Sequence, residues 1–213
     1  MTRLIIVRHG ESNANKTRTF AGHLNIPLSE RGEMQAKMTA EYIVQRYQID
    51  KIYCSDLLRA YHTALPIANI TGAPLIKTEK LREIYAGDWE GKTFNELQTR
   101  YADTYGVWLC DIGNARPNSG EAVQELYERV YNALQEIVFE NDGKTIAVAT
   151  HATPIRALQC RFSGFSVNEM KNVPWVTNDS VTVVDYENGV FSLVSVSEDK
   201  HLESLATGFP ANV

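Results

Sequence analysis

The sequence predicts an α/β fold with three α/β/α layers, in which helices cover both faces of a mostly parallel, mixed sheet. Apolar runs of strand length alternate with segments of helical period through most of the chain, which is typical of a parallel sheet covered by helices. Near the C-terminus, two strand-like runs flank the turn residues Glu187, Asn188 and Gly189, which indicates a hairpin. The hairpin supplies the antiparallel pair that makes the sheet mixed.

The expected strands are short runs of apolar residues. Residues 4–7 read Leu-Ile-Ile-Val and are expected to form a buried first strand. The remaining strands are expected at 51–54, 75–77, 146–149, 181–186 and 191–196.

The expected helices lie between these strands, and two of them begin at recognisable capping residues. Ser29 is the expected N-cap of the first helix, whose apolar face runs to Tyr47. Thr93 and Glu96 form a capping box that begins a short helix. The other expected helices lie at about 60–70, 126–138 and about 155–162.

The chain length favours one domain with an insertion. At 213 residues, we expect residues 1–213 to form a single domain. The stretch at 81–118 is less regular than the rest and is rich in aromatic residues and glycine. We therefore interpret 81–118 as an insertion or lid over the functional site.

The charge balance and the cysteines exclude several classes of partner. Twenty-one basic and 26 acidic residues give a net charge of −5, so the protein has no overall positive charge that would attract nucleic acid or an anionic membrane. No apolar run approaches the ~18 residues of a membrane span. The apolar run near the N-terminus, at 4–7, is too short for the apolar region of a secretion signal. The three cysteines form neither a CxxC pair nor a disulfide framework, so we expect a cytoplasmic protein.

Basic residues follow three of the expected strands. Arg8 and His9 come directly after the first strand, Arg59 lies shortly after the second, and His151 follows the strand at 146–149. In open α/β sheets, ligands bind outside the carboxyl ends of the strands, so we expect these side chains to meet at one edge. Two arginines and two histidines in an acidic protein indicate a local phosphate site.

These residue types suit phosphoryl transfer. Arginine donates in a planar, bidentate fashion to phosphate oxygens, so Arg8 and Arg59 could replace a metal. A neutral imidazole held by an acceptor is a nucleophile, so one histidine is a candidate for a covalent phosphohistidine. A leaving alkoxide needs a proton, for which Glu83, Asp88 and Glu90 are the available acids. The sequence has no HExxH, HxH or cysteine pair, so we expect no metal and no cofactor.

Five blocks of the sequence carry a family resemblance. They read LIIVRHGESNANKTRTFAGHLNIPLSERG at 4–32, SDLLRAYHTA at 55–64, LREIYAGDWEGKTFNEL at 81–97, SGEAVQELYERV at 119–130 and IAVATHATPIRAL at 146–158. In this order, they strongly resemble the histidine phosphatase superfamily, the phosphoglycerate mutase-like proteins. The resemblance implies a phosphoglycerate mutase-like fold and a metal-independent histidine acid-base phosphatase, a phosphoric monoester hydrolase that needs no cofactor.

The resemblance also implies a role for individual residues. It makes His9 the phosphorylated nucleophile. Glu83 matches the family's usual proton donor, which acts as acid in phosphorylation and then as base for the attacking water. The residues expected to hold the phosphate are Arg8, Asn15, Arg59 and His151.

Three departures from the family's mutases disfavour mutase activity. Cofactor-dependent phosphoglycerate mutases typically carry Ser or Thr before the glycine that is Gly22 here, whereas this chain has Ala21. After the acid they usually continue with Arg-His-Tyr, where this chain reads Ile-Tyr-Ala at 84–86. Their long arginine-bearing insertion is also missing, and GDWEG at 87–91 is similar to the phosphatase members.

The leading hypothesis is a phosphatase that hydrolyses small phosphomonoesters through a phosphohistidine. One alternative is a mutase or bisphosphatase, which would need a phosphate donor to prime His9. Another is a non-catalytic module that binds phosphorylated ligands, against which the intact set of nucleophile, acid and phosphate ligands argues. The expected partner is a small phosphorylated metabolite, with no nucleic acid and no membrane, and a homodimer stays open as the assembly.

Overall fold

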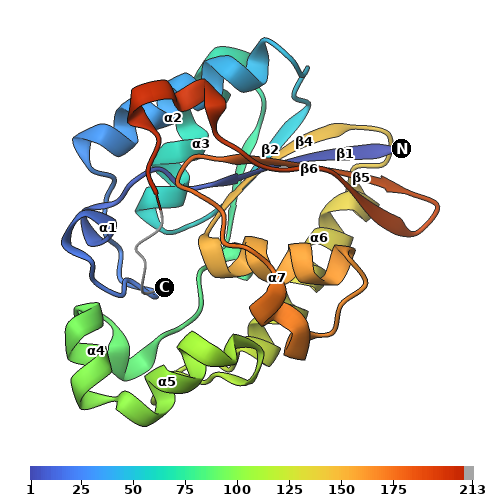
Figure 1. The fold of residues 1–213 in the computed structure, drawn as a ribbon. Coiled ribbons are helices and arrows are strands. Elements are labelled where there is room, and N and C mark those ends of the chain that lie inside the picture. The colour runs from blue at the N-terminus through green and yellow to red at the C-terminus, as the bar shows by residue number, and fades with distance from the viewer. Residues whose placement is uncertain (209–213) are drawn as a thin grey trace.

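A six-stranded mixed sheet forms the centre of the computed structural model, which describes residues 1–208 (Figure 1). The strand order is β3-β2-β4-β1-β5-β6. The four strands β1 to β4 run parallel, whereas β5 runs antiparallel to both β1 and β6. This arrangement confirms the predicted sheet. The strands are β1 (Thr2–Arg8), β2 (Lys51–Ser55), β3 (Leu75–Thr78), β4 (Thr145–Thr150), β5 (Val181–Glu187) and β6 (Val190–Glu198).

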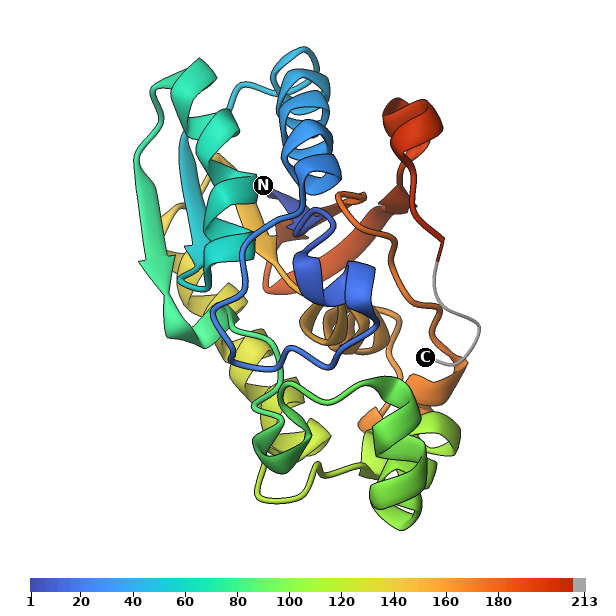
Figure 2. The same ribbon diagram turned by 90° about the vertical axis from the view of Figure 1, so that its left-hand side faces the viewer.

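Helices cover both faces of this sheet, as the sequence predicts. In two perpendicular views, α2 and α3 lie on one face while α6 and α7 lie on the other (Figures 1 and 2). Within residues 1–208, no helix is both long enough and apolar enough to cross a membrane. The α-helices are α1 (Asn13–Thr17), α2 (Glu30–Val44), α3 (Leu58–Thr71), α4 (Phe94–Arg100), α5 (Ala102–Cys110), α6 (Val123–Glu140) and α7 (Ala152–Phe162). Short 3₁₀ helices span Glu79–Leu81, Gly87–Trp89, Ile112–Asn114, Val167–Asn172 and Lys200–Leu205.

The capping residues act as the sequence predicts. The Ser29 side chain accepts a hydrogen bond from the backbone N–H of Gly32 at the start of α2. Thr93 and Glu96 form a reciprocal capping box at the start of α4. Each expected strand and helix is present, with ends shifted by a few residues. The first helix, α2, ends at Val44, so the expectation that its apolar face runs to Tyr47 is wrong.

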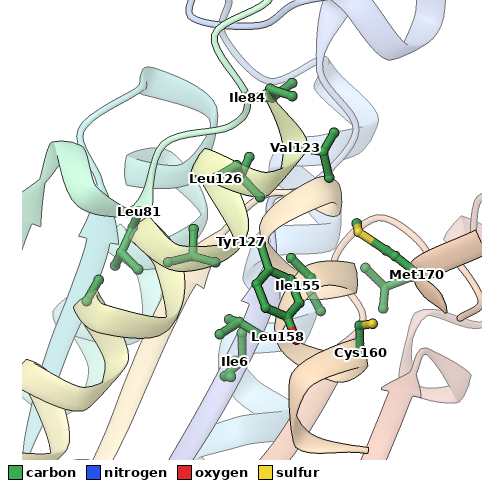
Figure 3. Packing of buried hydrophobic residues seen from close by; sticks show 14 of the residues in the cluster. Ile6, Leu81, Ile84, Val123, Leu126, Tyr127, Ile155, Leu158, Cys160 and Met170 are labelled. Carbon is green, nitrogen blue, oxygen red and sulfur yellow. The ribbon is translucent and has the colours of Figure 1, made fainter. Parts of the chain in front are cut away.

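The sheet buries one apolar cluster on each face. The larger cluster lies between the sheet, α6 and α7, and part of it is drawn in Figure 3. Alternate residues of β1 divide between the two clusters, because successive side chains of a strand point to opposite faces. Ile6 thus packs under α6 and α7, whereas Ile5 and Val7 pack on the side of α2 and α3. The strand that precedes His9 is consequently buried on both faces.

The segment 81–118 contains one helix more than we expect from the sequence. The expected short helix is α4, and α5 follows it directly. Figure 1 shows both helices away from the sheet, on the side of α7. Our interpretation of 81–118 as an insertion or lid, and of 1–213 as one domain, stays a prediction.

Gly32 allows α2 to touch the loop after the first strand, so Gly32→Ala is expected to destabilise the protein by at least about 2 kcal/mol. A Cβ at this position would lie 2.0 Å from the carbonyl oxygen of Glu11. Gly106→Ala is the matched control, since a Cβ there meets nothing within 4 Å and lies inside α5. The control should gain about 0.5 kcal/mol. Urea denaturation measures both, and equal stabilities would contradict this account of Gly32.

Candidate active site

One cavity lies at the carboxyl edge of the parallel strands. Arg8 ends β1 and His9 follows it, Arg59 lies in the first turn of α3 after β2, and His151 follows β4. Parallel strands bring these ends together. The predicted site residues that line the cavity are Arg8, His9, Asn15, Arg59 and Glu83. The sixth, His151, is fully buried beside His9 and does not line it.

His9 is held in the tautomer that suits a nucleophile. Its Nδ1 lies 2.7 Å from the backbone carbonyl oxygen of Gly10. A carbonyl oxygen only accepts, so Nδ1 carries the proton and the lone pair of the neutral ring is on Nε2. Burial, followed by the charges of Arg59 and Arg8, lowers the pKa of His9 well below its usual range. The ring is therefore neutral at physiological pH.

His151 packs edge-on against His9, with the ring centroids 5.1 Å apart. It is the N-cap of α7, whose N-terminus carries a partial positive charge. Burial, followed by the charge of Arg59, lowers the pKa of His151 well below its usual range. Neither ring nitrogen has a hydrogen-bond partner among residues 1–208. Buried imidazole nitrogens usually have partners, so this pair suits a ligand that brings its own donor or acceptor atoms.

The two arginines are buried and fixed by backbone carbonyls. Arg8 donates from Nη1 to the carbonyl oxygen of Val176 at 2.6 Å. Arg59 donates to the carbonyl oxygens of Gly22 at 2.7 Å and Leu24 at 2.9 Å. Burial lowers the pKa of each guanidinium to about 10, so both remain charged. Two fixed positive charges beside neutral histidines make this cavity suited to an anion.

Glu83 lines the same cavity and is held by backbone N–H groups. Its Oε1 accepts from the N–H of Ile84 at 2.8 Å, and its Oε2 accepts from the N–H of Thr153, at the start of α7, at 3.3 Å. The competing acids of the sequence analysis, Asp88 and Glu90, do not line the cavity. Of these three acids, Glu83 is therefore the one placed to exchange a proton with a bound ester.

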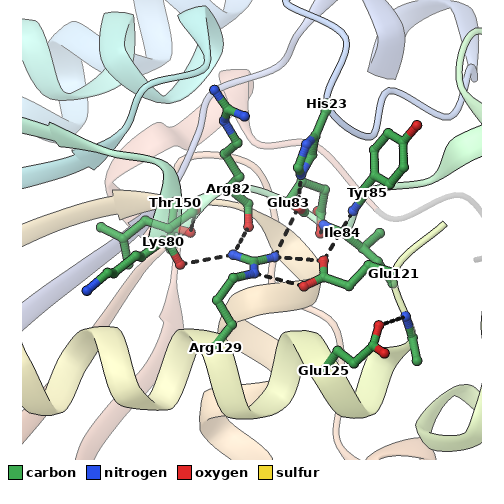
Figure 4. Close-up of polar contacts among 12 residues, drawn as sticks. His23, Lys80, Arg82, Glu83, Ile84, Tyr85, Glu121, Glu125, Arg129 and Thr150 are labelled. Atoms are coloured by element: carbon green, nitrogen blue, oxygen red, sulfur yellow. Dashed lines mark hydrogen bonds and ion pairs between the residues drawn. The ribbon is translucent and has the colours of Figure 1, made fainter.

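Arg129, on α6, braces the backbone around Glu83 (Figure 4). Its guanidinium donates to the carbonyl oxygens of Lys80, Arg82 and Glu83 at 2.9, 3.1 and 3.3 Å. It also forms two hydrogen bonds of 2.8 Å to the Glu121 carboxylate.

His23 supports the same backbone from the opposite side. Its Nε2 donates to the carbonyl oxygen of Glu83 at 2.8 Å. These carbonyls lie at the end of the short 3₁₀ helix Glu79–Leu81 and just after it, so these donors satisfy oxygens that a longer strand or helix would otherwise pair. The sequence analysis missed both Arg129 and His23.

The turn before β5 adds further site residues that sequence reasoning missed. Asn178 donates from Nδ2 to the carbonyl oxygen of His9 at 3.1 Å and to Oδ1 of Asn15 at 3.4 Å. Asn15 also uses Oδ1 to accept from Ser12, so its Nδ2 is left for a ligand. Asp179 is buried beside Gly10, and burial raises the pKa of its carboxyl well above its usual range. Because β5 is antiparallel to β1, its N-terminal end lies at the sheet edge where the parallel strands end. Polar residues just before a predicted antiparallel strand are therefore the signal that would have indicated Asn178.

The donor set of the cavity suits phosphate chemistry. Among residues 1–208, no group of three or more histidine, cysteine, aspartate or glutamate side chains is placed to hold a metal ion. The cavity instead combines buried guanidinium groups, an imidazole with its lone pair on Nε2 and a carboxyl group that can give or take a proton. Together these can neutralise a phosphoryl group, attack its phosphorus and protonate a leaving oxygen.

Comparisons with known proteins point to the same chemistry. The sequence profile of the histidine phosphatase superfamily (branch 1) matches residues 4–199. Phosphoserine phosphatase 1 of Hydrogenobacter thermophilus is 34% identical over 169 residues, which cover 79% of this chain and 80% of that protein. The adenosylcobalamin/alpha-ribazole phosphatase of Salmonella typhimurium is 33% identical over 159 residues, covering 75% and 78%. The structure of Bacillus stearothermophilus YhfR aligns with a TM-score of 0.91 at 28% identity, covering 95% of this chain and all of that one.

Proposed function

Because this chain belongs to the histidine phosphatase superfamily and hydrolyses phosphomonoesters as a phosphatase, we propose that His9 carries the phosphoryl group during its reaction. The observation that carries this proposal is the hydrogen bond from Nδ1 of His9 to the Gly10 carbonyl, which leaves the lone pair on Nε2. Arg8 and Arg59 lie in the same cavity as that ring. The substrate is a small phosphorylated molecule.

The proposed reaction has two steps. In the first, Nε2 of His9 attacks phosphorus while Glu83 protonates the leaving alcohol oxygen, so that the P–O bond breaks as the P–N bond forms. In the second, Glu83 takes a proton from water, whose oxygen attacks phosphorus and releases inorganic phosphate and neutral His9. Arg8, Arg59, His151 and Asn15 hold the nonbridging oxygens and neutralise their charge in both transition states.

The test is phosphate release from a panel of alkyl and aryl phosphomonoesters, with and without EDTA. We expect turnover that survives the chelator, because two arginines occupy the place where a divalent cation would otherwise hold the phosphate. Loss of turnover in EDTA and its recovery with one metal would contradict this mechanism. Interconversion of 2- and 3-phosphoglycerate, assayed beside it, would support the mutase alternative.

Binding of an anion is expected to be accompanied by proton uptake. Burial and the nearby arginines lower the pKa of both His9 and His151. A bound dianion stabilises the protonated rings, so their pKa values rise and affinity increases as pH falls. We expect sulfate, whose own charge is constant in this range, to bind more tightly at about pH 6 than at about pH 8. Calorimetry in two buffers measures the protons, and a pH-independent affinity would count against this electrostatic account.

We also propose a cytoplasmic location, which the cysteines support. Cys54, Cys110 and Cys160 are all unpaired within the described part of the chain. Free thiols are usual where the compartment is reducing. The homodimer stays a prediction, which light scattering of the purified protein measures directly.

A further inference from the structure

We propose that the alcohol part of the preferred substrate is a planar, apolar and uncharged group that packs on an aromatic wall of the cavity. This inference rests on the proposed function, because it concerns the leaving group of the same reaction. It narrows the small phosphomonoesters to one chemical class, the arylalkyl and aryl phosphates.

The wall lies in the same cavity as His9 and Glu83 and comes from three separate parts of the chain. One residue follows α1, three belong to α4 and α5, and one precedes β5. Ligand sites are typically lined mostly by apolar and aromatic side chains, with a few polar groups that set orientation. The five aromatic residues of the wall are Phe20, Phe94, Tyr105, Trp108 and Trp175.

Edge-to-face contacts fix most of these rings in place. Phe20 contacts Trp108 with ring centroids 5.3 Å apart, and contacts the fully buried Trp89 at 5.5 Å. Tyr105 contacts the same Trp89 at 5.5 Å. Phe20, Tyr105 and Trp108 are each less than a tenth exposed. The wall is therefore preformed, so a bound ring is not required to order it.

Trp175 forms the half-buried side of the wall. Its ring lies 6.3 Å from that of Trp108, centroid to centroid. The Arg156 guanidinium lies 4.3 Å from the Trp175 centroid, a cation–π contact that holds the indole. Arg156 itself donates to the carbonyl oxygen of Val173 at 2.7 Å and does not line the cavity. An aromatic leaving group can therefore pack on a fixed indole without meeting the guanidinium.

The charges of the cavity argue against a second charged group on the substrate. Among the described residues that line it, the positive or protonatable bases are Arg8, His9 and Arg59, which face the phosphate. Burial raises the pKa of the Tyr105 phenol, and the charge of the nearby Arg18 opposes that rise, but Arg18 is exposed and does not line the cavity. A carboxylate on the leaving group would lose its water without gaining a cation.

An ammonium group on the leaving alcohol would also lack a free partner of opposite charge in the cavity. The acids that line the cavity are Glu11 and Glu83. Glu11 already accepts a hydrogen bond of 2.7 Å from the Ser29 hydroxyl, and Glu83 is assigned to the leaving oxygen. The other lining groups are uncharged amides, hydroxyls and aromatic rings. The cavity therefore favours a neutral aromatic alcohol over an amino-acid or hydroxy-acid ester.

The experiment compares the phosphate esters of three primary alcohols: 2-phenylethyl phosphate, butyl phosphate and phosphoserine. This choice keeps the acidity of the leaving alcohols similar and varies the group that meets the wall. We expect kcat/KM for 2-phenylethyl phosphate to exceed that for the other two by at least about tenfold, chiefly through KM. Trp175→Ala should reduce the ratio of 2-phenylethyl to butyl phosphate by about tenfold.

Phe139→Ala is the matched control, because Phe139 is an exposed aromatic residue on α6 outside the cavity. Its ratio of 2-phenylethyl to butyl phosphate should equal that of the wild type. If Trp175→Ala does not fold, Phe94→Leu tests the same wall from α4.

The outcomes test the preference for an aromatic alcohol separately from the phosphatase function. Turnover of phosphoserine at or above that of 2-phenylethyl phosphate overturns the aromatic preference and leaves the phosphatase function standing. An unchanged ratio in both wall variants also overturns it. Failure to hydrolyse any of the three esters would overturn the proposed function itself.

Discussion

His9→Ala is expected to lower kcat/KM for every phosphomonoester by at least about 10³-fold, because alanine removes the atom that forms the P–N bond. The purified wild type, mixed with a ³²P-labelled ester and quenched, should retain acid-labile label that His9→Ala does not. The variant should still bind sulfate, since Arg8 and Arg59 are held by backbone carbonyls and not by the imidazole.

His62→Ala is the matched control for the loss of a histidine. His62 lies on α3, one turn after Arg59, and does not line the cavity. We expect it to hydrolyse esters at the wild-type rate and to retain label. Label that persists in His9→Ala, or turnover within about tenfold of the wild type, would assign the nucleophile to another residue.

Glu83→Gln is expected to slow the first step most for substrates whose leaving group needs a proton. For alkyl phosphates, kcat should fall by about 10²- to 10⁴-fold, because the alkoxide no longer receives a proton. For 4-nitrophenyl phosphate, the first step should survive, since nitrophenolate leaves without protonation. The second step lacks its base, so we expect a burst of one nitrophenolate per enzyme followed by slow turnover, measured by stopped flow.

Arg129→Lys tests whether the brace positions Glu83. Lysine retains the positive charge but cannot donate simultaneously to the three carbonyls and the Glu121 carboxylate. We expect a smaller loss with the same dependence on leaving group as in Glu83→Gln. If the rate of the first step falls equally for alkyl and nitrophenyl esters in both variants, the acid lies elsewhere.

The sequence predicts much of the fold and of the site because both depend on local patterns. The apolar runs and capping residues indicate the alternating strands and helices. The rule that ligands bind after parallel strands selects Arg8, His9, Arg59 and His151 without any coordinates. The family resemblance then selects Glu83 from the three candidate acids and adds Asn15, which lies in the short helix α1.

The remaining site residues have no comparable local signal. Asn178 precedes an antiparallel strand, so the rule for parallel strands passes over it. Arg129 lies on an amphipathic helix, where a charged residue is usually solvated. Its partner carbonyls lie 46–49 residues away, in and just after a short 3₁₀ helix. The helix α5 has a weak sequence signal because it contains Gly106 and two aromatic residues, Tyr105 and Trp108, which have low helix propensity. The contacts of Asn178 and Arg129 form only when distant parts of the chain pack together.

The central position of β1 also determines when the nucleophile can be assembled during synthesis. Both neighbours of β1 are made late: Arg3 pairs with Thr145 on one side and with Asp185 on the other. Until the ribosome has released both partners, the apolar run of β1 has two unpaired edges, a state prone to aggregation. Contacts this distant in sequence also slow folding, because long loops must close first. Although His9 is among the first residues translated, its site is among the last parts of the molecule to form.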